Sequence, residues 1–346
     1  RIKVSGARLH NLRSVDANIP IGRLTVVTGV SGSGKSTFAR EVLLDNLANA
    51  VGIGEPEKWF GCQSIEDWQY IDRVLEVDQT PIGKTPRSCP ATYIGFWDDI
   101  RKQFADTQEA RMRGWKTNRF SFNTGDGRCP VCEGQGMRTV EMSFLPDVKV
   151  PCDACHGDRF NADTLSARLR GKHVGEVLSM EVDEAVEFFA AHPKVAHPLK
   201  LMQDVGLGYL TLGQPSPTLS GGEAQRIKLV TELAKAKVTD GVIKTGRASR
   251  LPHTLYVLDE PTVGLSMADV EKLIHVLHRL TDAGNTVVVI EHNLDVIAEA
   301  DWVVDLGPEG GSQGGRLVAQ GSPDVLISDH LKQSHTAQAL KPLLKH

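Results

Sequence analysis

Residues Gly29 to Ser36 have the types and spacing of a phosphate-binding loop. They fit the pattern G-x-x-x-x-G-K-[ST] at every fixed position. The glycines let backbone N–H groups turn inward around phosphate oxygens, and the positive end of the following helix favours the same anion. In such a loop Lys35 reaches the β- and γ-phosphates and Ser36 ligates Mg²⁺. The sequence therefore predicts a nucleoside triphosphate site here.

Two consecutive carboxylates supply the second part of this chemistry. The apolar run 255–258 ends at Asp259 and Glu260. We expect Asp259 to hold Mg²⁺, directly or through water, and Glu260 to orient or deprotonate the attacking water. Two acids at a strand end are often only a solvated turn, so this interpretation depends on the phosphate loop. His292 follows the run 286–290, at the edge of the sheet where ligands bind in open α/β folds.

Short apolar runs and helical patterns alternate around these residues. The predicted strands are 24–28, 255–258, 286–290 and 302–306. The predicted helices are 35–47, 269–283 and 293–299. Buried strands alternating with helices predict an α/β fold, a mostly parallel sheet with helices on both faces.

The stretch from about 83 to 215 interrupts this alternation and contains a helical pattern near 182–191. It predicts an insertion into the α/β domain. The expected division is therefore a first part of the ATP-binding domain, an inserted domain and a second part of the ATP-binding domain: 1–82, 83–239 and 240–346. The polar, glycine-containing segment 237–253 is predicted to be a mobile loop.

Four of the six cysteines form two Cys-x-x-Cys pairs, Cys129 with Cys132 and Cys152 with Cys155. A glycine follows each pair at the same offset, which favours two tight knuckles in a zinc module at 129–155. Four thiolates make a closed, structural Zn²⁺ site. A redox dithiol is the alternative, but two matched pairs favour the metal.

The bulk composition is that of an ordinary soluble protein, with 346 residues, 40% of them hydrophobic and 24% charged. No apolar run approaches the roughly 20 residues of a membrane span. There is no signal-peptide pattern, so we expect a cytoplasmic protein that contacts no membrane. Because the first residue is Arg rather than Met, we also expect a trimmed chain or a fragment.

The segment 84–128 differs in charge from the rest of the chain. It holds nine Lys or Arg against five Asp or Glu, a local charge of +4 in a chain of net charge −4. Seven aromatic residues are interleaved with these charges. Such a mixture suits phosphate contact and base stacking. On composition alone, a solvated basic face over a small core is the simpler interpretation.

The run Leu219–Arg226, sequence LSGGEAQR, resembles the signature motif of ABC ATPases in the form typical of the UvrA family. Ser220 and the amides of Gly221 and Gly222 begin a helix and can hold a γ-phosphate. In ABC proteins this motif closes over ATP bound by a partner domain. The resemblance therefore implies two half-sites per chain, each completed by a second ABC module from the same native chain or from a homodimer.

The resemblance to the UvrA family extends over nearly the whole chain. The matching segments are 6–8 with 11–12, 28–37, 77–83, 85–88, 120–123, 144–148, 219–226, 259–265, 290–293 and 305–308. It implies the damage-recognition ATPase of bacterial nucleotide excision repair, a component of the excinuclease system but not its nuclease. Its implied cofactors are ATP, Mg²⁺ and Zn²⁺, and its implied partner is duplex DNA.

The resemblance also implies individual roles. Gln79 contacts Mg²⁺ and the water, His292 senses the γ-phosphate, and both join Glu260 as catalytic residues. The remaining nucleotide and Mg²⁺ contacts are Gly29, Ser31, Gly32, Ser33, Gly34, Lys35, Ser36, Thr37, Ser220, Gly221, Gly222 and Asp259, with Ser36, Gln79 and Asp259 at the Mg²⁺. With this context the basic segment is interpreted as DNA-binding, with expected phosphate contacts at Lys84, Arg87, Arg111, Arg113, Lys116 and Arg119.

One P-loop and one signature indicate a single module, most like the C-terminal one of the two in UvrA proteins. The segment before Gln79 is too short for a UvrB-binding domain, so we expect UvrB in the full system but no direct contact. Residues 266–269, SMAD, depart from the family, which usually has His and then an aromatic residue. This departure keeps open a paralogue or a drug-resistance protein. A transporter subunit and a ribosomal ABC ATPase are alternatives that the cysteine module disfavours.

Overall fold

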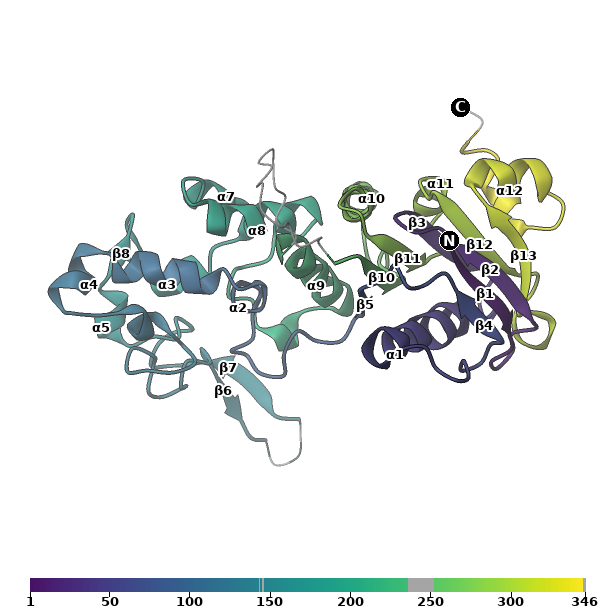
Figure 1. Ribbon diagram of the computed structural model, residues 1–346. Helices are drawn as coiled ribbons and strands as arrows, with labels where there is room; N and C mark the ends of the chain where they lie inside the picture. Colours follow the sequence, from purple (N-terminus) through teal and green to yellow (C-terminus); the bar gives the residue numbers. More distant parts are fainter. Residues whose placement is uncertain (143, 145, 236–251, 345–346) are drawn as a thin grey trace. The chain divides into compact units, whose positions relative to one another are not determined.

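The computed structural model describes residues 1–142, 144, 146–235 and 252–344, and its contacts divide the chain into two units. One unit comprises residues 1–78 with 238–346, and the other comprises 79–237 (Figure 1). The expected domain limits at 82/83 and 239/240 remain predictions. The second limit lies outside the described residues, as does most of the predicted mobile loop at 237–253.

A six-stranded sheet forms the centre of the first unit. Its strands, in spatial order, are β13 (Arg316–Gly321), β12 (Trp302–Gly307), β3 (Leu24–Gly29), β11 (Thr286–Ile290), β10 (Thr254–Asp259) and β5 (Arg73–Val77). Neighbouring strands are parallel except for β12 and β13. The predicted α/β class is confirmed, and the four predicted strands are β3, β10, β11 and β12.

Both faces of this sheet are covered. Every residue of β3 from Leu24 to Thr28 is at most 2% exposed, and successive side chains of a strand point to opposite faces. The long helical segment after β3 comprises η1 (Thr37–Leu44) and α1 (Asp45–Ile53), and η1 contacts β5 and β10. The helices α10 (Met267–Asp282), α11 (Leu294–Ala298) and α13 (His335–Leu340) also contact the sheet. The predicted layers of helix, sheet and helix follow.

A second, three-stranded antiparallel sheet packs into the same core. It consists of β2 (Val15–Ile19), β1 (Ile2–Ala7) and β4 (Ser64–Glu66). The alternating buried side chains of β1 and β2 join the cluster that contains Phe38 and Val42 of η1. The remaining elements of this unit are η4 (Gly311–Gln313) and α12 (Pro323–Asp329).

The second unit is mainly helical, as predicted for the insertion. Its helices are α2 (Pro90–Ile94), α3 (Trp97–Ala105), α4 (Gln108–Met112), η2 (Thr117–Phe120), α5 (Ala162–Leu165), α6 (Val174–Leu178), α7 (Val182–Phe188), α8 (Pro193–Asp204), η3 (Ser216–Thr218) and α9 (Gly221–Lys235). Its strands form the hairpins β6 (Met137–Val140) with β7 (Val148–Pro151) and β8 (Arg168–Leu169) with β9 (Lys172–His173). Among the described helices of the chain, none has both the length and the apolar character to cross a bilayer.

Candidate nucleotide half-sites and metal centre

The loop after β3 is shaped by glycine. Gly29 has a φ of 134°, and a Cβ atom there would lie 1.9 Å from the carbonyl oxygen of Leu306. At this position only glycine fits, because the neighbouring strand β12 leaves no space. From this loop Lys35 Nζ donates to the carbonyl oxygens of Gly29 and Val30, at 3.0 Å each. The lysine is thus folded back over the loop, as a phosphate-binding cation must be.

Carboxylates surround the Lys35 ammonium. Burial lowers the pKa of Lys35, while the nearby charges of Glu260, Asp259 and Asp305 act in the opposite direction. Burial raises the pKa of Asp259, and Arg40, whose Nη1 lies 3.5 Å from Asp259 Oδ2, opposes that shift. A half-buried lysine facing acids at the end of β10 provides the charges that triphosphate and Mg²⁺ require. The donor set therefore fits both ligands.

Glu260 and His292 lie next to each other at the carboxyl ends of β10 and β11. Glu260 has a φ of 43°, and its amide donates to the carbonyl oxygen of Ile290 at 2.9 Å. The Glu260 carboxylate Oε1 lies 3.8 Å from His292 Nδ1. Both side chains are exposed, so water and substrate can reach them. A carboxylate beside an imidazole can orient a nucleophilic water.

Glu291 is the functional-site residue to which sequence reasoning gave no role. Its side chain is completely buried and accepts four hydrogen bonds. Oε1 accepts from the amide and hydroxyl of Thr262, at 2.9 and 2.5 Å, and Oε2 accepts from the amides of His292 and Asn293, at 2.9 and 3.0 Å. One carboxylate therefore fixes both the loop after Glu260 and the loop that carries His292. The sequence does contain a signal for this residue, because an acid stands directly between the apolar run 286–290 and His292.

The signature residues begin helix α9 with a reciprocal cap. Ser220 Oγ accepts from the amide of Glu223 at 3.2 Å, and Glu223 Oε2 accepts from the amide of Ser220 at 2.7 Å. Tyr209 Oη donates to Glu223 Oε1 at 2.5 Å. In the same unit Gly221 packs on Gln79, because a Cβ on this glycine would lie 3.1 Å from the Gln79 side chain. Thus Gln79 and the signature lie together, in the second unit, whereas Lys35 and His292 belong to the first.

The four predicted metal-binding cysteines meet at one point. Their sulfur atoms all lie within 4.8 Å of one another, at 3.9 Å between Cys129 and Cys152 and 3.6 Å between Cys132 and Cys155. A tetrahedron with zinc–sulfur bonds of about 2.3 Å separates its sulfurs by about 3.8 Å. All four are free thiols, at distances far beyond a disulfide bond. The geometry fits Zn²⁺ and disfavours the redox alternative.

The knuckles also supply the amide donors that thiolates need. Gly136 N donates to Cys132 Sγ at 3.2 Å, and the amide of Gly134 bonds the same sulfur. Cys155 Sγ accepts from the amides of Gly157 and Arg159. Gly134 and Gly157, the glycines at matched offsets, have φ values of 80° and 94°. These turns bring two N–H groups to the sulfur of Cys132 and two to that of Cys155, and such donors orient metal ligands.

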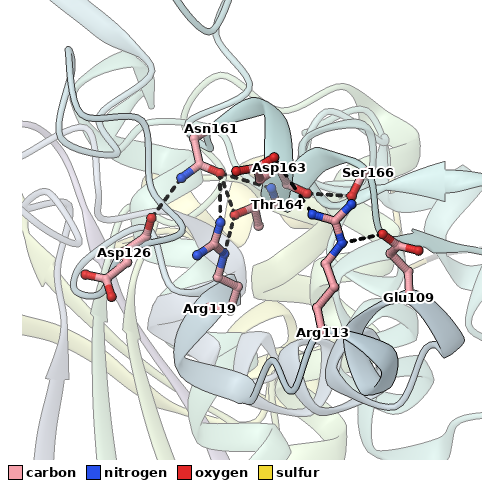
Figure 2. Close-up of polar contacts among 8 residues, drawn as sticks. All are labelled: Glu109, Arg113, Arg119, Asp126, Asn161, Asp163, Thr164 and Ser166. Carbon is pink, nitrogen blue, oxygen red and sulfur yellow. Dashed lines mark hydrogen bonds and ion pairs between the residues drawn. The ribbon is translucent and has the colours of Figure 1, made fainter.

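Two of the predicted DNA contacts, Arg113 and Arg119, also make polar contacts within the protein (Figure 2). Arg119 donates to Thr164 Oγ1 at 2.8 Å and Asn161 Oδ1 at 3.3 Å. Arg113 Nε contacts Glu109 Oε1 at 2.5 Å, and both guanidinium groups stack on Trp115. These two arginines therefore hold α4 and η2 to the segment around α5.

The other four predicted contacts differ among themselves. Arg87 bonds the Glu133 carbonyl oxygen at 3.2 Å and pairs with its carboxylate at 3.4 Å. Arg111 pairs with Asp106 at 3.6 Å but is largely exposed. Lys84 and Lys116 are exposed, and neither side chain has a hydrogen-bond or ion-pair partner in the part of the chain that the structure describes. These two lysines are the side chains best able to reach a phosphate.

Comparison with known proteins gives one consistent result. UvrABC system protein A of Haemophilus influenzae is 53% identical over 344 residues, which are 99% of this chain and 35% of that protein. The protein of the same name from Thermus thermophilus is 55% identical over 323 residues, 93% of this chain and 32% of that one. Over nearly its whole length the chain is homologous to these UvrA proteins. It spans about a third of the length of these curated relatives.

A solved structure agrees with this UvrA assignment. UvrA2 from Deinococcus radiodurans matches with a TM-score of 0.86 and 48% identity, over 99% of this chain and 40% of that one. No protein-family model matches the chain. The departure from the UvrA pattern at 266–269 has a local structural role, since Ser266 Oγ accepts from the amide of Asp269 at 3.2 Å and so caps α10. Met267, the next residue, is 83% exposed.

Proposed function

We propose that this chain is a DNA-binding ABC ATPase module that recognises damaged DNA in nucleotide excision repair. It binds ATP with Mg²⁺ and holds a structural Zn²⁺. ATP binding closes it against a second ABC module, and hydrolysis reopens the pair. The module belongs to an excinuclease system without being its nuclease, and it acts without direct contact to UvrB. The observation that carries the proposal is one P-loop half-site and one signature half-site in a chain homologous to UvrA proteins.

The geometry supports hydrolysis at a shared site. Lys35 and Asp259 supply the charges for triphosphate and Mg²⁺, and Glu260 with His292 stands at the same edge of the sheet. Ser220, at the N-terminus of α9, supplies the hydroxyl and the helix end that would meet the γ-phosphate of a partner. Each chain thus offers complementary halves of the reaction centre.

The hairpin of β6 and β7 supports the DNA-binding part of the proposal. It extends from the cysteine cluster and exposes apolar side chains at Val140, Val148 and Phe144, the last 98% exposed. Arg138 and Lys149 on the same strands add positive charge. An exposed aromatic ring on such a hairpin suits stacking on a base that damage has loosened from its neighbours.

The test is fluorescence anisotropy of duplex DNA titrated with the whole chain at fixed salt, with and without ATP and Mg²⁺. We expect tighter binding to a duplex with one bulky adduct, and an affinity that changes with nucleotide. Phe144→Ala should reduce the preference for the adduct, whereas Phe60→Ala, an exposed phenylalanine of the first unit, should not. Equal affinity for damaged and intact duplexes, or no binding at moderate salt, would contradict the proposal.

A UvrA-like paralogue that protects against DNA-bound drugs is the second candidate. One observation favours it: residues 266–269 depart from the pattern usual in the family. The same anisotropy titration separates the two candidates. A duplex carrying a reversibly bound intercalator should compete better than a covalent adduct if the paralogue function is correct, and worse if the repair function is.

A further inference from the structure

Arg159 is a buried arginine beside the cysteine cluster. It is 4% exposed and has a left-handed backbone, with a φ of 70°. Its amide bonds Cys155 Sγ, and its carbonyl oxygen accepts from the amide of Cys129 at 2.8 Å. The backbone of one residue therefore joins the two knuckles of the proposed zinc site.

The side chain of Arg159 joins two other segments. Nη1 donates to the carbonyl oxygen of Pro86 at 2.9 Å, and Nη2 donates to that of Gly213 at 2.8 Å. The guanidinium plane also lies over the ring of Phe122, 5.0 Å from its centroid. Both hydrogen-bond acceptors found for it are neutral carbonyl groups. Among the residues that the structure describes, no carboxylate forms an ion pair with this guanidinium.

Thiolates that hold a metal at the four cysteines would place negative charge beside Arg159. Four thiolates around one Zn²⁺ carry a net charge of −2, which a buried site must balance. Arg159 is placed to balance part of that charge, because its own backbone bonds Cys155 Sγ and the amide of Cys129.

The two segments that Arg159 joins lead directly to nucleotide-site residues. Pro86 belongs to the segment that begins at Gln79, and Gly213 precedes the signature. Ser216 connects them, because its Oγ donates to the carbonyl oxygen of Gly83 at 2.7 Å and its amide to that of Ser88 at 2.8 Å. Gly221 then packs on Gln79. These contacts all lie within the second unit.

We propose that Arg159 couples the metal at the four cysteines to the conformation of Gln79 and the signature. With metal bound, the cluster holds the backbone of Arg159, its guanidinium holds the carbonyl groups of Pro86 and Gly213, and the segments 79–88 and 213–222 are fixed. When the metal leaves, this bridge loosens and both segments become mobile. The inference rests on the zinc binding proposed above, and it makes Arg159 a positioning residue that contacts neither nucleotide nor DNA.

The first readout is zinc affinity of the whole chain, measured by competition with a chromophoric chelator. Arg159→Met should weaken zinc binding roughly 10- to 100-fold, as losses of groups around metal ligands do. Arg159→Lys keeps the charge without the paired hydrogen bonds and should fall between. Arg119→Met removes another half-buried, ring-stacked arginine of the same unit and should leave zinc affinity unchanged.

The second readout is amide hydrogen exchange with and without zinc. In the wild-type chain, zinc removal should speed exchange in 79–88 and 213–222 as well as in the hairpin 137–151. In Arg159→Met, zinc removal should still affect the hairpin but should change the two segments no further, because the bridge is already absent. If Arg159→Met does not fold, the same comparison is made with Arg159→Lys, which should give a reduced response.

Three results would contradict different parts of the inference. A wild-type chain that contains no zinc by metal analysis would overturn the proposed cofactor, and with it the coupling. A chain that binds zinc, but whose 213–222 amides exchange equally fast with and without the metal, would overturn the coupling and leave the proposed function intact. Equal losses of zinc affinity in the Arg159 and Arg119 variants would show a general packing effect and would overturn the specific role of Arg159.

Discussion

A single buried carboxylate controls the geometry of two loops at the candidate active site. Glu291 has no exposed surface, and each of its oxygens accepts two hydrogen bonds. A glutamine of the same shape presents an NH₂ group where one oxygen stood, so two N–H or O–H donors lose their acceptor. Buried donors without an acceptor, together with the loss of hydrogen bonds to a charged group, lower the free energy of unfolding several times more than the loss of a surface contact does.

We therefore predict that Glu291→Gln destabilises the chain by about 3 kcal/mol. Because Thr262 and His292 lose their common anchor, ATP hydrolysis should fall as well. Glu299→Gln is the matched control, since Glu299 is exposed and pairs with His278, at 3.7 Å. It should change stability by less than about 1 kcal/mol. Urea unfolding and steady-state hydrolysis measure both effects, and equal stability of the two variants would contradict the role given to Glu291.

The basic residues allow a second prediction at the residue scale. Removing Lys84 and Lys116 together, each to Ala, should reduce the slope of log affinity for DNA against log salt by about one unit per lost phosphate contact. Stability should change by no more than about 0.5 kcal/mol, because both side chains are exposed. Arg119→Ala should lower stability and leave the salt slope unchanged, since it breaks the bonds to Thr164 and Asn161. If Arg119→Ala changes the salt slope and the lysine double variant does not, the division between the two kinds of residue is contradicted.

Residue types and spacing identified most of the candidate site, because phosphate and metal chemistry require particular groups. Gly29, Lys35, Asp259 and the four cysteines could be assigned before any geometry was known. The arginines could not, because sequence gives charge but not direction. Arg113 and Arg119 lie in a basic segment, yet both stack on Trp115. Arg119 also bonds Thr164 and Asn161, more than forty residues away in sequence, and Arg113 pairs with Glu109, one helical turn away.

At the scale of elements, strand prediction succeeded where strands are buried on both faces. β3, β10, β11 and β12 consist mainly of apolar residues, so each gives a clear signal. The edge strands β5 and β13 are less deeply buried and include charged and polar residues, so their apolar signal is weaker. The helix after the phosphate loop continues to Ile53, beyond the predicted end near residue 47, because α1 extends η1 without a break.

Helix α13 is attached to the sheet through one buried acid, which gives a prediction about pH. Ser334 Oγ and Thr336 Oγ1 donate to Asp305 on β12, at 2.5 and 3.1 Å. Burial raises the pKa of Asp305, and the two hydroxyl groups oppose that shift. A carboxyl group whose pKa is raised by folding binds its proton more tightly in the folded state. Its ionised form therefore costs stability at neutral pH, and this cost disappears as the pH falls through the folded pKa.

Asp305→Asn removes this titration. The free energy of unfolding of the wild type, relative to Asp305→Asn, should rise as the pH is lowered from 7 toward the ordinary aspartate range near about 4. Urea unfolding at several pH values gives this difference directly. Asp324→Asn, at an exposed position in α12, should follow the wild-type curve. A difference between Asp305→Asn and wild type that stays constant with pH would show that the raised pKa has no effect on folding.

At the scale of the whole molecule, the two half-sites imply that one chain cannot hydrolyse ATP efficiently alone. Lys35, Asp259 and Glu260 belong to the first unit, and Ser220 with its helix belongs to the second. If ATP joins the first unit of one chain to the second unit of another, hydrolysis per chain should rise with protein concentration. Glu260→Gln should slow hydrolysis about 10²- to 10⁴-fold, and it should accumulate an ATP-dependent dimer in sedimentation velocity.

Mixing two inactive variants tests this arrangement most directly. Lys35→Ala lacks the phosphate-binding cation but keeps an intact signature, whereas Ser220→Ala lacks the signature hydroxyl but keeps an intact phosphate loop. Each variant alone should hydrolyse ATP very slowly. In a mixed dimer one of the two composite sites takes its phosphate loop from the Ser220→Ala chain and its signature from the Lys35→Ala chain, so that site is intact. In an equal mixture half of the dimers are mixed, and each has one intact site of two. Activity should therefore return to roughly a quarter of the wild-type rate. A double variant carrying both substitutions cannot complement either single variant in this way and serves as the control. No recovery on mixing, with normal dimer formation, would mean that each chain completes its own site.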